Sequence, residues 1–402
     1  MEQAQFIEKY SKDRRQTHSL KWDALEERFG DKQLLPLWVA DMEFSVPETV
    51  KEALVERAGH GIFGYSQVPD DYFSAFDEWQ KRQHGIELQE EWLRFSKGVV
   101  ESLYHLLQIY TEEGDAVLIQ PPVYYPFFNA INDTERRGVF NHLVLEDGEY
   151  RIDFADFEEK IRANHVKVFI LCSPHNPVGR VWQEAELVRM LEICKKYDVL
   201  VIADEIHQDF VYAPHHFRSV LQVADGSFQD QVIVVNAPSK TFNLASLLNG
   251  HILIPNDKLR ETFDQKIKRY SQSENSLLGQ LAGKVAYQTG DEWFAALKEV
   301  IVSNYHYVRE TFAAQLPEVK VADLQGTYLL WLDLSRLLSS VEIESFIKEE
   351  CGLAVDFGGW FSQETQQYIR LNLATTPENV RQAVQQLLQG LERKTKHDET
   401  HR

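Results

Sequence analysis

Three short and almost continuous apolar runs constrain the fold most strongly. They lie at residues 166–172, 199–203 and 232–236, and polar residues follow each of them. Runs of this kind are typical of strands buried on both faces. Residues 184–197, between the first two runs, place apolar side chains at helical spacing, and strand–helix–strand order predicts a parallel sheet flanked by helices. Ligands of such sheets bind beyond the carboxyl ends of the strands, so the polar residues there are candidates for chemistry.

Two helix starts are indicated by residues that suit a helix N-terminus. Thr376 followed by Pro377 predicts a helix with a threonine cap and proline at the first helical position. Near the other end of the chain, Ser45 and Glu48 have the spacing of a capping box, and the helix they begin is expected to stop at Gly59.

The C-terminal part has a different pattern and predicts a second, smaller domain. Residues 327–334 and 368–373 are expected strands that precede the helix at Thr376. The chain has 402 residues, more than the roughly 250–300 that one core usually fills. We therefore expect an α/β fold with a mostly parallel, helix-flanked sheet in a large domain and a smaller α+β domain. The expected ranges are 48–288 for the large domain, and 1–47 with 289–402 for the small one.

Composition does not favour anionic macromolecular partners. The chain has 42 basic and 62 acidic residues and a net charge of −20, which repels nucleic acid and anionic membranes. It contains no apolar run of about 18 residues, and residues 1–5 do not resemble a signal peptide. Cys172, Cys194 and Cys351 are widely spaced and the histidines lack ligand spacing, so neither a disulfide framework nor a metal site is predicted. We expect a cytoplasmic protein without metal, nucleic acid or membrane partners.

Three of the polar positions that follow the apolar runs suit one kind of chemistry. Lys240 could attack an aldehyde if burial kept its amine partly neutral. Asp204 could pair with a protonated pyridine nitrogen, and Asn176 could donate a hydrogen bond to a phenolate oxygen. Each position also has an ordinary alternative: a solvated loop lysine, a helix cap, and a connecting turn. Their order and spacing together are more specific than any one of them.

These motifs resemble those of fold type I pyridoxal-5′-phosphate (PLP) enzymes of the aminotransferase class I/II superfamily. The resemblance rests on Ser-Pro-His-Asn-Pro at 173–177, Asp-Glu at 204–205 and Ser-Lys-Thr-Phe-Asn at 239–243. Residues 37–44, LWVADMEF, and 204–207, DEIH, are similar to the cystathionine β-lyase/cysteine-S-conjugate β-lyase (C–S lyase) branch. The similarity extends from about residue 20 to about residue 390.

The resemblance implies that PLP is the cofactor, bound by the large domain. Lys240 would hold it as a Schiff base, Asp204 would face the ring nitrogen, and Tyr124 would stack on the ring, with Tyr125 as the alternative; Lys240, Asp204 and Tyr124 are the implied catalytic residues. His207 stands where the wider superfamily often has tyrosine. The implied cofactor-binding residues are Tyr65, Val99, Val100, Tyr124, Asn176, Asp204, His207, Ser239 and Lys240.

The expected phosphate site departs from the wider superfamily. Gly98 begins a predicted helix whose free N–H groups suit a phosphate. The superfamily often has a serine three residues before the lysine and an arginine eight after it, but here these positions are Ala237 and Leu248. Ser239 and Tyr65 are the expected substitutes.

The resemblance also implies how substrate and subunits are arranged. Arg370 matches the arginine that binds the substrate α-carboxylate, for which a guanidinium fork is well suited. Tyr65 matches a residue that reaches the site across a dimer interface, so a homodimer is expected. The implied substrate-binding residues are Val39, Ala40, Tyr65, Asn176 and Arg370.

The implied reaction is α,β-elimination on L-cystathionine, L-cysteine or cysteine S-conjugates, giving pyruvate, ammonia and a thiol or hydrogen sulfide. An aminotransferase would use the same lysine and aspartate, and residue chemistry does not separate the two. A regulatory protein that binds a partner on the same fold is the alternative of another class, although the intact set of Lys240, Asp204, Asn176 and Arg370 favours an enzyme.

Overall fold

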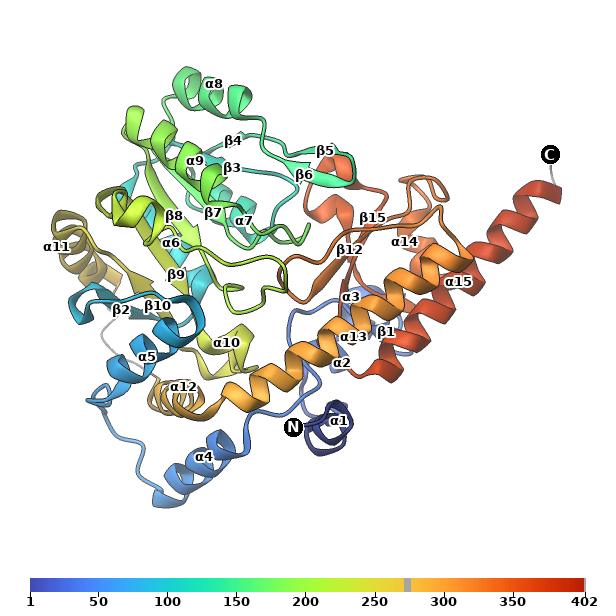
Figure 1. Cartoon of the computed structure of the whole chain (residues 1–402), viewed down its shortest axis with the longest axis horizontal. Coiled ribbons are helices and arrows are strands. Elements are labelled where there is room, and N and C mark those ends of the chain that lie inside the picture. The colour runs from blue at the N-terminus through green and yellow to red at the C-terminus, as the bar shows by residue number, and fades with distance from the viewer. Residues whose placement is uncertain (271–275, 401–402) are drawn as a thin grey trace.

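A seven-stranded sheet forms the centre of the larger part of the molecule (Figure 1). The computed structural model describes residues 1–270 and 276–400. The strand order is β2-β10-β9-β8-β7-β3-β4; the five strands from β9 to β4 are parallel, and β10 is antiparallel to both of its neighbours. The predicted α/β fold with a mostly parallel sheet is confirmed. The strands are β2 (Leu93–Ser96), β3 (Ala116–Ile119), β4 (Arg137–Phe140), β7 (Val168–Cys172), β8 (Leu200–Asp204), β9 (Val232–Asn236) and β10 (Gly250–Leu253).

The three apolar runs are the neighbouring strands β7, β8 and β9. Cys172 pairs with Asp204, and Asp204 pairs with Val235, so the three strands end almost level. Alternate residues face opposite sides: Val168 and Ile170 belong to one apolar core, and Phe169 and Leu171 to the other. Both faces of the sheet are therefore covered, which is why these sequences lack polar alternation.

Helices pack on the two faces of this sheet (Figure 1). Apolar residues of α6, α7 and α11 form one core with the sheet, while α5, α8, α9 and α12 contribute to the other. The predicted helix at 184–197 is confirmed as α9. The helices of this part are α4 (Glu48–His60), α5 (Tyr72–His84), α6 (Val99–Tyr110), α7 (Pro126–Asp133), α8 (Phe154–Asn164), α9 (Glu184–Lys196), α10 (Pro238–Thr241), α11 (Asp257–Lys266) and α12 (Leu277–Thr289), and a hairpin of β5 (Val144–Glu146) and β6 (Glu149–Arg151) lies beside them.

A four-stranded antiparallel sheet, in the order β11-β12-β15-β14, organises the C-terminal part. The long helices α13 and α15 pack together along it (Figure 1). The N-terminal segment joins this part, because β1 pairs with β13 and α1 packs on α13. The elements are α1 (Gln3–Tyr10), α2 (Leu20–Asp23), α3 (Leu25–Phe29), β1 (Leu35–Pro36), α13 (Asp291–Gln315), β11 (Lys320–Val321), β12 (Leu329–Asp333), α14 (Ile343–Ser345), β13 (Leu353–Ala354), β14 (Asp356–Phe357), β15 (Tyr368–Asn372) and α15 (Pro377–Thr400).

One predicted helix start is confirmed and the other is wrong. Asn379 N donates to Thr376 Oγ1 at 3.3 Å, and α15 begins at Pro377 as expected. Helix α4 begins after Pro47 without a side-chain cap and ends at His60, with Gly61 in the left-handed region at φ 75°. Ser45 instead lies in the loop before the helix, where its N–H donates to Tyr10 O and its carbonyl accepts from Trp293 Nε1.

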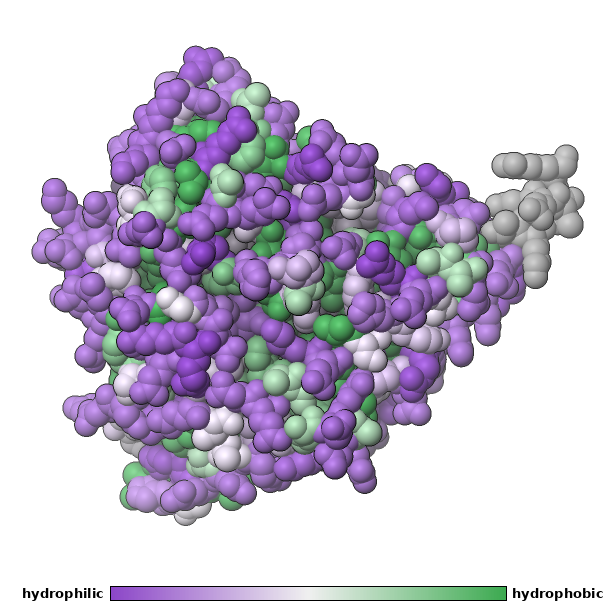
Figure 2. Space-filling model, viewed as in Figure 1, coloured by the Kyte–Doolittle hydropathy of each residue, from purple (hydrophilic) through white to green (hydrophobic). Residues whose placement is uncertain are grey.

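The surface is mostly hydrophilic on the face seen in Figure 2, and hydrophobic residues appear on it in small separate patches. This distribution agrees with the excess of acidic residues. Within residues 1–270 and 276–400, no helix is both long and apolar enough to span a bilayer.

Candidate active site

A cavity of about 330 Å³ lies at the carboxyl ends of β7, β8 and β9. Most of the predicted cofactor residues line it, although they come from five separate segments of the chain. A larger surface hollow of about 1000 Å³ beside α13 contains none of the predicted site residues among the described ones. The residues that line the smaller cavity are Ala40, Lys97, Gly98, Val99, Val100, Glu101, Tyr124, Cys172, Asn176, Asp204, Ile206, His207, Ser239, Lys240, Ala245, Leu248 and Asn249.

Lys240 reaches this cavity from α10, the short helix that follows β9. Pro238 occupies the first helical position, which suits a residue without an N–H group. The Lys240 Nζ donates to the Ala40 carbonyl at 2.7 Å. Desolvation lowers the pKa of Lys240 to about 8, and the Asp41 carboxylate opposes this shift. A substantial fraction of the amine is therefore neutral at mildly alkaline pH, as nucleophilic attack requires.

Asp204 is the last residue of β8 and is almost completely buried. Its Oδ1 accepts from Ile206 N at 3.1 Å. Desolvation raises its pKa to about 7, and the hydrogen bond from Ile206 and the charge of Lys240 only partly offset the shift. A carboxyl group in this state would be ionised more readily beside a cationic ligand.

Asn176 and Arg370 join the two sheets at the cavity. Arg370 lies on β15, and its Nη1 donates to Asn176 Oδ1 at 2.9 Å. Its Nη2 donates to Trp38 O at 3.2 Å and pairs with Asp356. Arg370 is buried and does not line the cavity, but its Nε has no hydrogen-bond partner among the described residues. The Nε is therefore a buried donor without a partner, in a side chain that contacts Asn176 of the cavity.

Aromatic residues complete the cavity wall. Tyr124 is half-buried and lines the cavity, whereas Tyr125 packs against Trp360 and Phe361 with ring centroids 6.1 and 6.2 Å away. This placement favours Tyr124 over Tyr125 as the stacking residue. His207 also lines the cavity, and its Nδ1 has no hydrogen-bond partner within the described parts of the chain. Burial, followed by the charges of Lys240 and Arg370, holds the pKa of His207 well below its usual value, so its ring is neutral.

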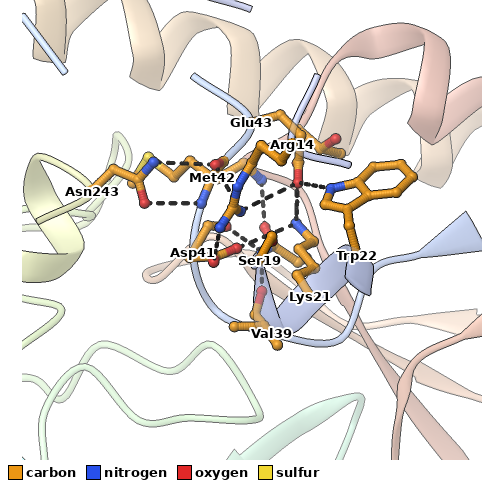
Figure 3. A network of polar contacts seen from close by, with 12 residues as sticks. Arg14, Ser19, Lys21, Trp22, Val39, Asp41, Met42, Glu43 and Asn243 are labelled. Atoms are coloured by element: carbon orange, nitrogen blue, oxygen red, sulfur yellow. Dashed lines mark hydrogen bonds and ion pairs between the residues drawn. The ribbon is translucent and has the colours of Figure 1, made fainter. Parts of the chain in front are cut away.

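The segment 39–44 passes over Lys240 and is fixed by hydrogen bonds to two asparagines. Asn372 Nδ2 donates to the carbonyls of Val39 and Asp41 at 2.6 and 2.7 Å. Asn243, three residues after Lys240, exchanges hydrogen bonds with the backbone of Met42 at 3.1 and 3.2 Å (Figure 3). The two asparagines, one from each part of the molecule, thus set the position of the Ala40 carbonyl.

Buried charges hold the same segment from its other side (Figure 3). Lys21 is fully buried and its Nζ lies 2.8 Å from a Glu43 carboxylate oxygen. Arg14 pairs with Asp41 at 2.7 Å, and Trp22 Nε1 donates to Glu43 at 3.1 Å. These contacts anchor the segment at its two acidic residues, Asp41 and Glu43.

Three of the predicted residues do not line the cavity. Val39 contributes its carbonyl to Asn372, and Arg370 lies behind Asn176. Tyr65 is 96% exposed and lies at another surface hollow, which it shares with Leu248 and Ser276. The cavity is also lined by Lys97, Ala245 and Asn249, which the sequence analysis does not predict as site residues. Of these three, only Lys97 has a sequence signal for a site, because it immediately precedes the predicted helix start at Gly98.

Comparison with known proteins identifies the family. Residues 32–387 match the family model described as aminotransferase class I and II. The chain belongs to this family. Curated relatives also match nearly the whole length of this chain. The expected family resemblance is confirmed.

Two curated relatives and one solved structure illustrate the match. The cystathionine beta-lyase PatB of Bacillus subtilis is 36% identical over 91% of this chain and 95% of its own. Protein MalY of Escherichia coli is 30% identical over 94% of this chain and 97% of its own. The crystal structure of cystalysin from Treponema denticola, which contains a pyridoxal 5′-phosphate cofactor, has a TM-score of 0.91 and 32% identity, covering 95% of this chain and 98% of that one.

Proposed function

We propose that this protein is a PLP-dependent carbon–sulfur lyase that performs α,β-elimination on sulfur-containing amino acids. One observation carries the proposal: the amine of Lys240, with its lowered pKa, shares a cavity with the buried carboxyl group of Asp204 in a chain similar to PatB over almost its full length. The substrates are L-cystathionine, L-cysteine or cysteine S-conjugates. The products are pyruvate, ammonia and a thiol or hydrogen sulfide.

The residues that line the cavity fit PLP. Lys240 would hold its aldehyde carbon, and Asp204 would face the ring nitrogen, whose positive charge would keep the carboxylate ionised despite its burial. Tyr124 offers a ring face for stacking, and Asn176 and the neutral His207 line the same cavity. The phosphate would meet Ser239, Val99 and Val100 at the start of α6, where unpaired backbone N–H groups favour an anion. When bound, PLP withdraws electrons from the bonds at the substrate Cα.

The remaining steps belong to the protein's own side chains. Arg370 binds the substrate α-carboxylate, and its free Nε together with its position beside Asn176 supports this role. The Lys240 amine would accept the proton from Cα. The Ala40 carbonyl, which accepts a hydrogen bond from Nζ at 2.7 Å, orients the amine. The Cβ–S bond then breaks with its electrons leaving on sulfur, and water converts the remaining fragment to pyruvate and ammonia.

We also propose that the enzyme is a cytoplasmic homodimer to whose active site Tyr65 of the second subunit contributes. Tyr65 is almost fully exposed and does not reach the cavity of its own chain. Leu248 lines both that cavity and the hollow that contains Tyr65, so the two places adjoin. Hydrophobic residues reach the surface near α4, at the lower edge of Figure 2. Several exposed apolar side chains belong to this region: Val55, Ile62, Phe63 and Tyr65.

Turnover of L-cystathionine without any keto acid tests the reaction. Sustained release of pyruvate and ammonia in proportion to time supports the lyase. A single turnover that ends in the pyridoxamine form of the cofactor would instead identify an aminotransferase, which the family also contains. Lys240→Ala should abolish turnover and the visible absorbance of the bound cofactor, and a purely partner-binding protein would not depend on that residue.

A further inference from the structure

The cofactor cavity contains few positive charges for a phosphate dianion. Lys97 and Lys240 are the cationic side chains among the described residues that line it, since His207 is neutral. The Lys240 amine is required at the aldehyde. The position at which the wider superfamily often has an arginine is Leu248 in this chain. Within the described parts of the chain, Lys97 is therefore the remaining cation that lines this cavity.

Lys97 stands at the place where a phosphate would bind. It directly precedes Gly98, the N-cap residue of α6, whose first N–H groups have no partners within the helix. Lys97 and Leu248 line the cavity together and also line the adjoining hollow, so both stand where the two spaces meet. A lysine here can supply the charge that an arginine at position 248 would have supplied.

The present partner of Lys97 holds it only weakly. Its Nζ lies 3.8 Å from Glu101 Oε1, beyond hydrogen-bonding distance, and 63% of the Lys97 side chain is exposed. Glu101 is anchored independently, because its Oε2 accepts from Lys97 N at 2.8 Å. The ammonium group is therefore free to turn toward a stronger anion, whereas the Glu101 carboxylate would repel that anion.

We propose that the Lys97 ammonium binds the phosphate of PLP and replaces the arginine that this chain lacks. Glu101 weakens phosphate binding on the same helical turn, and Lys97 offsets its charge. The proposal rests on PLP as the cofactor of this cavity. It concerns cofactor affinity, so its failure would leave the lyase reaction untouched.

Titrations of the full-length, cofactor-free protein with PLP and with pyridoxal, which lacks the phosphate, test this role. Lys97→Gln should weaken PLP binding about tenfold, as expected for one partly exposed charge-assisted hydrogen bond, and leave pyridoxal binding unchanged. Lys268→Gln is the matched control, since Lys268 is exposed and lines the adjoining hollow but not the cavity. Absorbance of the bound cofactor gives both affinities without any activity assay.

Two further measurements separate a charge effect from a structural one. Inorganic phosphate should compete with PLP in the wild type at several-fold lower concentration than in Lys97→Gln. Glu101→Gln should tighten PLP binding while pyridoxal binding stays the same. Equal losses of PLP and pyridoxal affinity in Lys97→Gln, or no loss of PLP affinity, would overturn the proposal.

Discussion

The buried carboxyl group of Asp204 makes the stability of the cofactor-free protein depend on pH. Desolvation raises its pKa to about 7 in the folded state, against about 3.9 in an unfolded chain. Because the folded value is the higher one, its favourable contribution is complete below about pH 4 and is lost as the pH rises through about 7. The variant Asp204→Asn does not lose this contribution. As the pH rises from 4 to 8, its free energy of unfolding should therefore increase by about 2–4 kcal/mol relative to that of the wild type.

Urea unfolding of both proteins across this pH range measures the difference. Asp225→Asn is a suitable control, since Asp225 is exposed and its left-handed backbone conformation suits asparagine. A stability difference that does not change with pH would show that Asp204 is ionised in the folded, cofactor-free protein.

At the residue scale, the sequence predicts site residues that follow a recognisable strand better than site residues in other segments of the chain. Lys240, Asp204 and Asn176 meet at one cavity because parallel strands end at the same edge. Lys97 directly follows β2, a strand that the sequence analysis does not predict, and Asn249 precedes the antiparallel strand β10 rather than following a strand. The hydrogen bond from Arg370 to Asn176 joins residues 194 positions apart, and no local pattern encodes it.

At the scale of elements, the segment 39–44 depends on a buried ion pair. Lys21→Met leaves the Glu43 carboxylate buried with Trp22 and a more distant Arg14 as partners. Removing one member of a buried pair typically costs about 3–5 kcal/mol, so we expect a loss of this size in the free energy of unfolding. Catalytic activity should fall as well, because the Ala40 carbonyl would lose its fixed position against Lys240.

The surface pair of Lys51 and Glu48 provides the comparison. Its N···O distance is 2.9 Å, similar to that of the buried pair, but both side chains are exposed. Lys51→Met should cost less than about 1 kcal/mol and leave activity unchanged. Urea unfolding and lyase assays measure the stability and activity of Lys21→Met and Lys51→Met. Equal losses in the two variants would contradict the anchoring role of Lys21.

Elements with a strong apolar pattern are predictable, whereas their ends depend on contacts distant in sequence. Strands β7, β8 and β9 and helix α9 lie within two residues of their predicted bounds. The predicted capping box at Ser45 is wrong because tertiary hydrogen bonds to Tyr10 and Trp293 hold the backbone of that residue in a loop. The spacing of Ser45 and Glu48 alone contains no information about these distant hydrogen-bond partners.

At the scale of the whole molecule, the active site depends on how the two sheets are placed. Arg370 on β15 reaches Asn176 beyond β7, and the N-terminal segment joins the C-terminal part through the pair of β1 and β13. This pairing agrees with grouping residues 1–47 with 289–402, and the proposed domain boundaries remain a prediction. Length and composition indicate two parts, but the contact between them follows from side chains far apart in sequence.

The proposed dimer predicts recovery of activity when two inactive variants are mixed. Lys240→Ala lacks the amine and Tyr65→Ala lacks the partner's tyrosine, so a mixed dimer contains one intact site if Tyr65 acts across the interface. Unfolding and refolding the variants together at equal amounts makes about half of the dimers mixed, which restores roughly a quarter of wild-type pyruvate release. Lys240→Ala mixed with Asp204→Ala should stay inactive, since both residues line the same chain's cavity. If Tyr65 acted within its own chain, the first mixture would stay inactive too, and light scattering would still report whether a dimer had formed.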